Sequence, residues 1–156
     1  MSSDRPDVEQ NTRERERLRA LVARLDDDDL RSSIYEDWTV AGVLGHIAFW
    51  DAWALALVRK VERGDPFSPS DAEADDVDTL NDATRLLIDS IAPRAAAELA
   101  VRLAEETDRR VASLPPERMY PNDADSPLNA VRALHRAEHL DDIEAALGAP
   151  RGSGAP

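Results

Sequence analysis

The chain has 156 residues, 42% of them apolar, which is enough for one domain with its own core. It contains no cysteine, so disulfides, thiolate metal ligands and a thiol nucleophile within the chain are excluded. The formal net charge of −13 would repel a phosphate backbone or an anionic lipid surface, so we expect neither nucleic acid nor membrane as a partner. The N-terminus lacks the order of a signal peptide, and no uninterrupted apolar run reaches the roughly 20 residues of a membrane span, which predicts a soluble, cytoplasmic protein.

Helical periodicity dominates the chain, and no segment alternates in the manner of a half-buried strand. A first amphipathic helix is predicted by four apolar residues at helical spacing with arginine and glutamate opposite them: Leu18, Leu21, Val22 and Leu25. The four aspartates at positions 26–29 follow this helix. Adjacent side chains fan around a turn and cannot converge on a cation, so we expect a solvated linker there.

The second helix is predicted to begin after Thr39, a good N-cap, with Trp38 packing onto Val43 at the fourth helical position. Gly64 is its expected stop. The acidic segment 65–78 lacks helical periodicity, and it also lacks the glycine and the terminal glutamate of a calcium-binding loop. It is interpreted as a surface loop.

Helical periodicity resumes over residues 78–114 and is interrupted at Pro93. A proline removes an amide donor and clashes with the preceding turn, so this helix is expected to be kinked or split there. Two collinear segments and one bent helix are both compatible with the pattern.

The last helix is predicted over residues 126–148, with Ser126 as N-cap and Pro127 at its first position. We therefore expect residues 1–148 to form a single all-α domain, an up-and-down bundle of four main helices. Residues 149–156 are small, proline-rich and glycine-rich, and are expected to form a flexible tail.

All three histidines lie in predicted helices, His46 in the second and His135 and His139 in the last. The latter pair is spaced i, i+4, so both imidazoles project from one helix face within about 6 Å at Cβ. Cofactor sites in bundles are built from inward-facing side chains on opposed helices, which makes His46 the third ligand from across the bundle. Three neutral imidazoles suit a divalent transition metal such as zinc, nickel or iron, and leave a coordination position open as in catalytic sites.

The same residues also have a purely structural interpretation. His46 can be a hydrogen-bonded core residue, and an isolated H-x-x-x-H on a helix is common by chance. Trp50 and Trp53 are expected in the core, although Trp50, one turn beyond His46, can also form the wall of a ligand pocket.

Two segments, WTVAGVLGHIAFWD at 38–51 and LHRAEHLDDIEA at 134–145, resemble the DinB/YfiT-like superfamily of bacterial four-helix metalloproteins. In that superfamily, a helix that opens with Trp-Thr or Trp-Ser carries one histidine, and an H-x-x-x-H on a late helix supplies two more. The resemblance implies that His46, His135 and His139 are the metal ligands.

Characterised members include transferases that use mycothiol, bacillithiol or glutathione, and the metal-binding domain of a mycothiol-dependent maleylpyruvate isomerase. The resemblance therefore implies a metal-dependent thiol S-transferase, and the chain, which has no cysteine, would need an external thiol. The arginine-rich composition, with lysine at position 60 only, is typical of GC-rich coding and makes mycothiol the first thiol to test. The isomerase branch usually has an acidic residue at the position of His135 and a further C-terminal domain, so maleylpyruvate isomerisation is not expected.

Two other functions remain open from the sequence. A metal-dependent hydrolase would use the same three ligands with a carboxylate base, for which Asp51, Glu138 and Asp142 are the candidates. A non-catalytic metal-binding or ligand-binding bundle is the other. Relatives often pair through bundle helices, so a homodimer is also expected.

Overall fold

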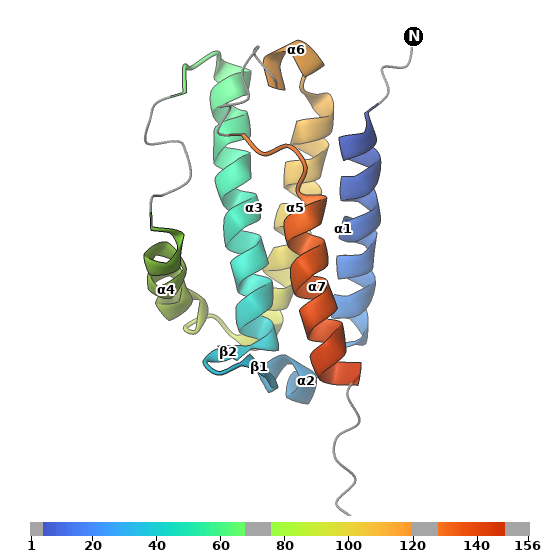
Figure 1. Ribbon diagram of the computed structural model, residues 1–156, viewed down its shortest axis with the longest axis vertical. Coiled ribbons are helices and arrows are strands. Elements are labelled where there is room, and N and C mark those ends of the chain that lie inside the picture. The colour runs from blue at the N-terminus through green and yellow to red at the C-terminus, as the bar shows by residue number, and fades with distance from the viewer. Residues whose placement is uncertain (1–4, 68–75, 120–127, 149–156) are drawn as a thin grey trace, which may run out of the picture.

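The computed structural model describes residues 5–67, 76–119 and 128–148. Four long helices form a bundle (Figure 1): α1 (Pro6–Arg24), α3 (Val40–Arg63), α5 (Pro93–Ser113) and α7 (Ala133–Gly148). Three shorter helices and one hairpin complete the described part: α2 (Asp27–Arg31), α4 (Val77–Ile88), α6 (Pro116–Met119), β1 (Ser33–Tyr35) and β2 (Trp38–Thr39). The two strands pair antiparallel, Ser33 with Thr39 and Tyr35 with Trp38. The predicted all-α bundle is confirmed.

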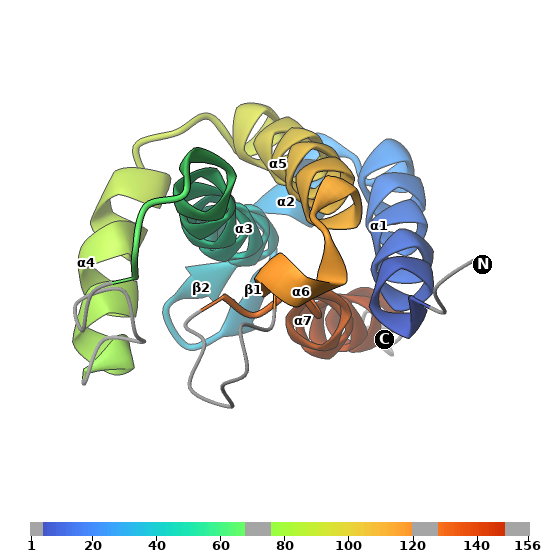
Figure 2. The ribbon, with the colours of Figure 1, turned by 90° about the horizontal axis from the view of Figure 1, so that it is seen from above.

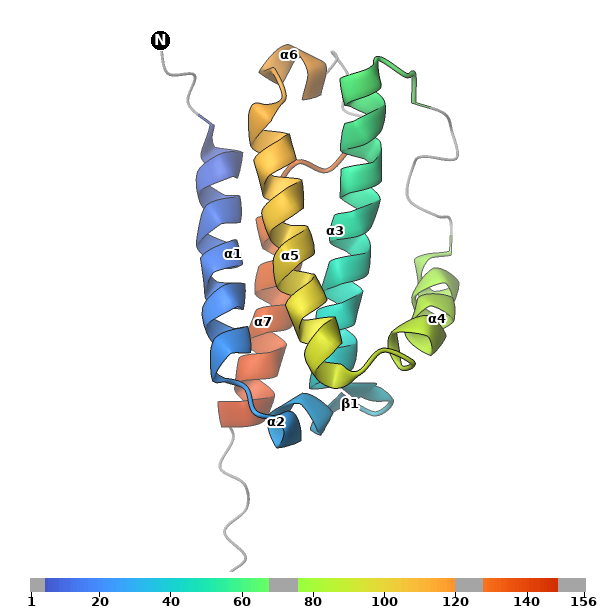
Figure 3. The same cartoon turned by 180° about the vertical axis from the view of Figure 1, so that it is seen from behind.

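The helix directions differ from the predicted up-and-down order, because the four long helices do not alternate strictly along the chain. In Figure 3, α1 and α7 run one way, while α3 and α5 run the other way. The reason is α4, which carries the chain back along the outside of α3, so that α5 starts at the same end of the bundle as α3. Figure 2, viewed along the bundle, shows α4 on the side of α3 that faces away from α1.

The core lies between α1, α3, α5 and α7. Leu18 and Leu21 of α1 are almost completely buried, as the helical pattern predicts, and Leu25 is buried at the end of that helix. α5 faces this core with a stripe of small residues that lets α3 approach closely: Ala97, Ala100 and Ala104. α3 thus becomes the central helix of the bundle, with α5 on one side and α4 on another.

Local capping sets the ends of α3. The Thr39 hydroxyl accepts a hydrogen bond from the Gly42 amide at 3.0 Å, so Thr39 is the predicted N-cap. Gly64 ends the helix in the left-handed conformation, at φ 74°, which other residues rarely adopt. Among the described residues, α3 alone has the length and composition of a membrane span, but 72% of its apolar stretch is buried inside the protein, as expected for a central bundle helix.

The predicted linker at residues 26–29 is wrong, because these residues form the start of α2. Asp26 accepts a hydrogen bond from the Asp29 amide, and the Asp29 carboxylate accepts one from the Asp26 amide. This reciprocal cap satisfies amides at a helix N-terminus, where carboxylates are also favoured by the helix dipole. The aspartates therefore act as caps on a short helix.

The predicted break at Pro93 is confirmed, since α4 ends at Ile88 and Pro93 is the first residue of α5. The two segments are neither collinear nor one bent helix: α4 packs on the outer side of α3, away from the axis of α5. The contact is close at Gly45 of α3, where an added Cβ would lie only 2.4 Å from Ile88 Cγ2. The absence of a side chain at Gly45 thus lets Ile88 of α4 pack directly against α3.

The last helix begins later than predicted, at Ala133, and residues 128–132 are not helical. Its first turn is capped from another helix: Asn11 of α1 accepts a hydrogen bond from the Ala133 amide at 2.9 Å and donates one to the Ala130 carbonyl at 2.8 Å. This contact spans the bundle, so the local pattern could not show it. The predicted capping residues Ser126 and Pro127, and the predicted tail at 149–156, lie outside the described residues.

Candidate metal centre

α3 and α7 bring the three histidines together. Their ligand nitrogens all lie within 4.8 Å of one another, and Nε2 of His46 is 3.2 Å from Nε2 of His135. The imidazole centroids of His135 and His139 are 4.7 Å apart, and that of His46 is 4.8 Å from that of His139. Two nitrogens bound to one tetrahedral zinc ion at about 2.0–2.1 Å are separated by about 3.4 Å. The donor set and its spacing therefore fit a divalent metal.

The surroundings of the imidazoles differ from those of a fully hydrogen-bonded core histidine. Nδ1 of each of the three histidines is buried, and none has a hydrogen-bond partner among the described residues. A satisfied core histidine would have partners for its buried ring nitrogens, because an unpaired buried polar atom costs about 1–3 kcal/mol. His46 is held by packing instead, edge-on to Trp38 and Trp50 at centroid distances of 5.6 and 6.5 Å.

All three imidazoles are kept neutral by burial. Burial lowers the pKa of His46 from 6.5 to about 4, and the neighbouring His139 adds to the effect. Burial, the other two histidines and nearby arginines lower the pKa of His135 to about 2. The pKa of His139 is lowered by burial as well, against the opposing charges of Glu138 and Asp142. Neutral imidazole is the form that binds metal, so at neutral pH no proton has to leave the cluster first.

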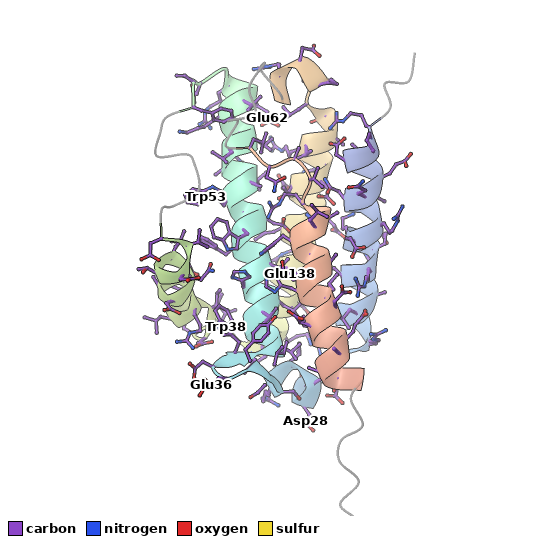
Figure 4. All side chains as sticks on the ribbon, in the orientation of Figure 1. Asp28, Glu36, Trp38, Trp53, Glu62 and Glu138 are labelled. Atoms are coloured by element: carbon purple, nitrogen blue, oxygen red, sulfur yellow. The ribbon has the colours of Figure 1, made fainter. Side chains whose placement is uncertain are left out.

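Two cavities meet at the histidine cluster. The first cavity, about 390 Å³, is lined by Tyr35, Trp38, Val43, His46, Asp78, Asn81, Asp82 and His139. The second cavity, about 400 Å³, is lined by His46, Trp50, Val77, Asn81, Asn129, Arg132, His135, Glu138 and His139. Figure 4 shows Trp38 between α3 and α4, and Glu138 on α7. Trp50 thus forms part of a cavity wall, one of the two roles considered for it.

The three carboxylates considered as bases differ sharply in their surroundings. Asp51 is completely buried, and its two oxygens accept hydrogen bonds from Arg132 at 2.9 Å and from Arg136 at 3.0 Å. Asp142 accepts the hydroxyl hydrogen of Tyr35, whose pKa is raised by burial and by that carboxylate. Glu138 is exposed and lines the second cavity. Of the three, Glu138 alone combines an accessible carboxylate with a position on a cavity wall.

The pairing of Asp51 belongs to a buried ion network that the sequence analysis missed. Arg136, fully buried, also donates two hydrogen bonds to Asp108 of α5, at 2.9 and 2.8 Å. Arg15 of α1 donates to the same carboxylate at 3.0 Å. The only sequence signal was the placement of Arg132 and Arg136 at i, i+4 around His135.

Residues 12–144 match the family described as the mycothiol maleylpyruvate isomerase N-terminal domain. The chain belongs to this family. The match includes most of α1, the three histidines and most of α7, and it confirms the DinB/YfiT-like resemblance. No curated protein and no solved structure matches the chain. Membership of this mycothiol-related family, together with the histidine cluster, indicates a metal-binding function.

Proposed function

We propose that the protein is a divalent-metal-dependent S-transferase that joins a low-molecular-weight thiol of the mycothiol type to an electrophile. The observation that carries the proposal is the position of three neutral imidazoles at the junction of two cavities. Each cavity falls within the range of about 300–1,000 Å³ typical of small-molecule sites. Two cavities at one centre suit a reaction that joins two small molecules.

His46, His135 and His139 would hold the metal, and their neutral nitrogens suit zinc, nickel or iron better than magnesium or calcium. When bound there, the ion keeps its full charge and favours the thiolate form of a nearby thiol. The chain has no cysteine, so the sulfur must come from an external molecule. The family match supports mycothiol as that molecule.

The remaining residues position the reactants and handle the proton. Glu138 can accept the thiol proton, because Asp51 is held by two arginines and Asp142 is bonded to Tyr35. Trp38 and Trp50 pack against His46, which is buried. We propose transfer rather than maleylpyruvate isomerisation, because His135 stands where the isomerase branch usually has an acidic residue.

The test is a conjugation assay with purified protein loaded with zinc, nickel or iron. Mycothiol, bacillithiol and glutathione are each supplied with 1-chloro-2,4-dinitrobenzene, and the S-conjugate is measured by absorbance. We expect metal-dependent conjugation that is lost in His139→Ala and retained in Arg109→Gln, a change at an exposed ion pair on α5. Absence of conjugate with every thiol and metal would overturn the proposal.

Two further outcomes identify the other functions. An ester substrate that is consumed equally with and without thiol, in a metal-dependent manner, would indicate a hydrolase with Glu138 as base. Stoichiometric metal binding with no turnover of either kind would indicate a non-catalytic metal-binding bundle.

A further inference from the structure

The second cavity is lined by three side chains that carry N–H groups, Asn81, Asn129 and Arg132. Asn81 lies on α4, Asn129 lies in the segment before α7, and Arg132 directly precedes the first residue of α7. In each of them, one polar atom is already held by a neighbour inside the protein. The atoms left over are hydrogen-bond donors.

Asn81 is oriented by Trp50. The indole nitrogen of Trp50 lies 3.1 Å from Oδ1 of Asn81. An indole N–H can only donate, so the amide must accept with its oxygen and its NH₂ group must point elsewhere. Asn81 lines both cavities and makes no other side-chain hydrogen bond among the described residues, so its two N–H donors remain for a ligand.

Arg132 is oriented by Asp51. Its Nε donates to Asp51 at 2.9 Å, but its two Nη groups make no hydrogen bond to a described residue, although Arg132 is only 6% exposed. Asp51 is also shared with Arg136, so one carboxylate serves two guanidinium groups. Charge is therefore incompletely balanced at Arg132, on the wall of the second cavity.

Asn129 repeats the arrangement. Its Oδ1 accepts a hydrogen bond from the Val131 amide at 3.1 Å, which leaves its NH₂ group as a donor. Glu138 lines the same cavity with the opposite charge, but it is exposed, whereas Arg132 is buried. A ligand carboxylate would form charge-assisted hydrogen bonds with the buried guanidinium of Arg132. Its repulsion by the exposed carboxylate of Glu138 is weaker, because water and salt screen that charge.

We infer that Asn81, Asn129 and Arg132 form a carboxylate-binding subsite beside the histidine cluster. A carboxylate has only acceptor oxygens and one negative charge, so it is chemically complementary to the amide donors and to the guanidinium on this cavity wall. The electrophile would then be selected for a carboxylate that anchors it while its reactive carbon faces the metal centre. The identity of this carboxylate as part of the electrophile rests on the proposed function, whereas the subsite itself does not.

Succinate and its uncharged analogue succinamide provide the test, by isothermal titration at pH 7.5. Each is titrated into zinc-loaded protein and into protein from which metal and chelator have been removed. We expect succinate to bind both forms, at least tenfold more tightly than succinamide, because hydrogen bonds between charged groups are stronger than those between neutral groups. Binding of succinate to the zinc-loaded form alone would overturn the subsite, since the metal would then be the receptor.

Two variants remove donors in different ways. Asn81→Asp keeps the acceptor for Trp50 but replaces the N–H donors with a negative charge, and Arg132→Gln removes the guanidinium. Each should weaken succinate binding at least tenfold in the metal-free form, while Arg109→Gln, the same change of charge at an exposed position, should leave it unaltered. Asn81→Asp retains the hydrogen bond to Trp50. It therefore still tests the subsite if Arg132→Gln fails to fold.

The result separates the two proposals. Loss of succinate binding in both variants supports the subsite even if the wild type forms no S-conjugate, in which case only the proposed function fails. Unchanged succinate binding in the folded variants overturns the subsite even if the wild type transfers thiol to a neutral electrophile.

Discussion

His46 is an imidazole in an apolar stretch of α3, and its single polar contact in the described part of the protein is with another histidine. Replacement of His46 by alanine should therefore matter most when metal is present. In metal-free protein we expect a loss of about 1–3 kcal/mol from the cavity left behind. Wild type should gain about 2.7 kcal/mol at a free metal concentration of 100 Kd, and the variant almost none. Thermal unfolding with and without zinc, alongside metal content, measures both effects.

Arg109→Gln is the control for His46→Ala, because it alters an exposed ion pair whose residues line neither cavity at the cluster. An equal loss of stability in the presence and absence of metal, with the metal content intact, would show that His46 is a core residue.

The lowered pKa values of the histidines predict how stability depends on pH in the metal-free protein. The pKa of His46 is about 4 in the folded state against 6.5 for a free imidazole, so the unfolded chain takes up a proton first as the pH falls. The contribution of this neutral histidine to the free energy of unfolding is fully present above pH 6.5. It is lost as the pH falls toward 4, by at most about 1.4 kcal/mol per pH unit for each group. Urea unfolding at pH 7, 6 and 5 should show that the free energy of unfolding depends less steeply on pH in His46→Gln than in the wild type. Identical slopes would contradict the assignment of the low pKa to burial of His46.

The residues of the site differ in how far the sequence reveals them. His46, His135 and His139 could be predicted because their helices are strongly periodic and the i, i+4 spacing puts two of them on one face. Asn81 could not be predicted, since a lone asparagine on an acidic helix carries no pattern, and for Arg132 the i, i+4 spacing to Arg136 does not identify a role. Their roles come from partners distant in the chain, Trp50 and Asp51.

At the scale of the elements, the packing of α4 against α3 can be tested at Gly45, where the two helices approach closely. A Cβ there would lie 2.4 Å from Cγ2 of Ile88 but 3.4 Å from its Cβ, so Gly45→Ala clashes only with the outer atoms of Ile88. Ile88 is stiff at χ1, and we expect the variant to lose about 1–3 kcal/mol. In an Ile88→Ala background, the same change should be neutral or stabilise by up to about 1 kcal/mol, since alanine favours helix.

Urea unfolding of the four proteins gives the coupling free energy of this cycle. A coupling near zero would mean that α4 does not depend on Gly45 for its place against α3. Strong coupling would show that the wall of both cavities is held by this contact, because Asn81 lies on α4.

Local chemistry explains which element boundaries were predictable. Thr39, Gly64 and Pro93 act through their own backbone or their nearest neighbours, and all three mark boundaries where expected. The start of α7 is set by Asn11, more than a hundred residues earlier in the chain. Sequence periodicity describes neighbouring residues only, so it cannot reveal a partner at that distance. The short helix α2 was missed because its aspartates suggest solvated chain as readily as a capping box.

At the scale of the whole molecule, the arrangement of helix directions creates the site. Because α4 returns the chain along the outside of α3, it stands beside the histidine cluster and supplies the outer wall of both cavities. A strictly alternating bundle would leave that face of α3 open to water. The long connection that complicates the fold is thus also the element that encloses the candidate centre.

The buried ion network joins all four long helices, with Arg15 on α1, Asp51 on α3, Asp108 on α5 and Arg136 on α7. Replacement of Arg136 by methionine leaves two buried carboxylates short of a partner, which should cost about 3–5 kcal/mol in urea unfolding. The matched change Arg109→Met, at an exposed pair, should cost less than about 1 kcal/mol. High salt should shrink the smaller effect but not the larger, since buried pairs are poorly screened. Equal losses in the two variants would mean that the network adds nothing beyond an ordinary surface ion pair.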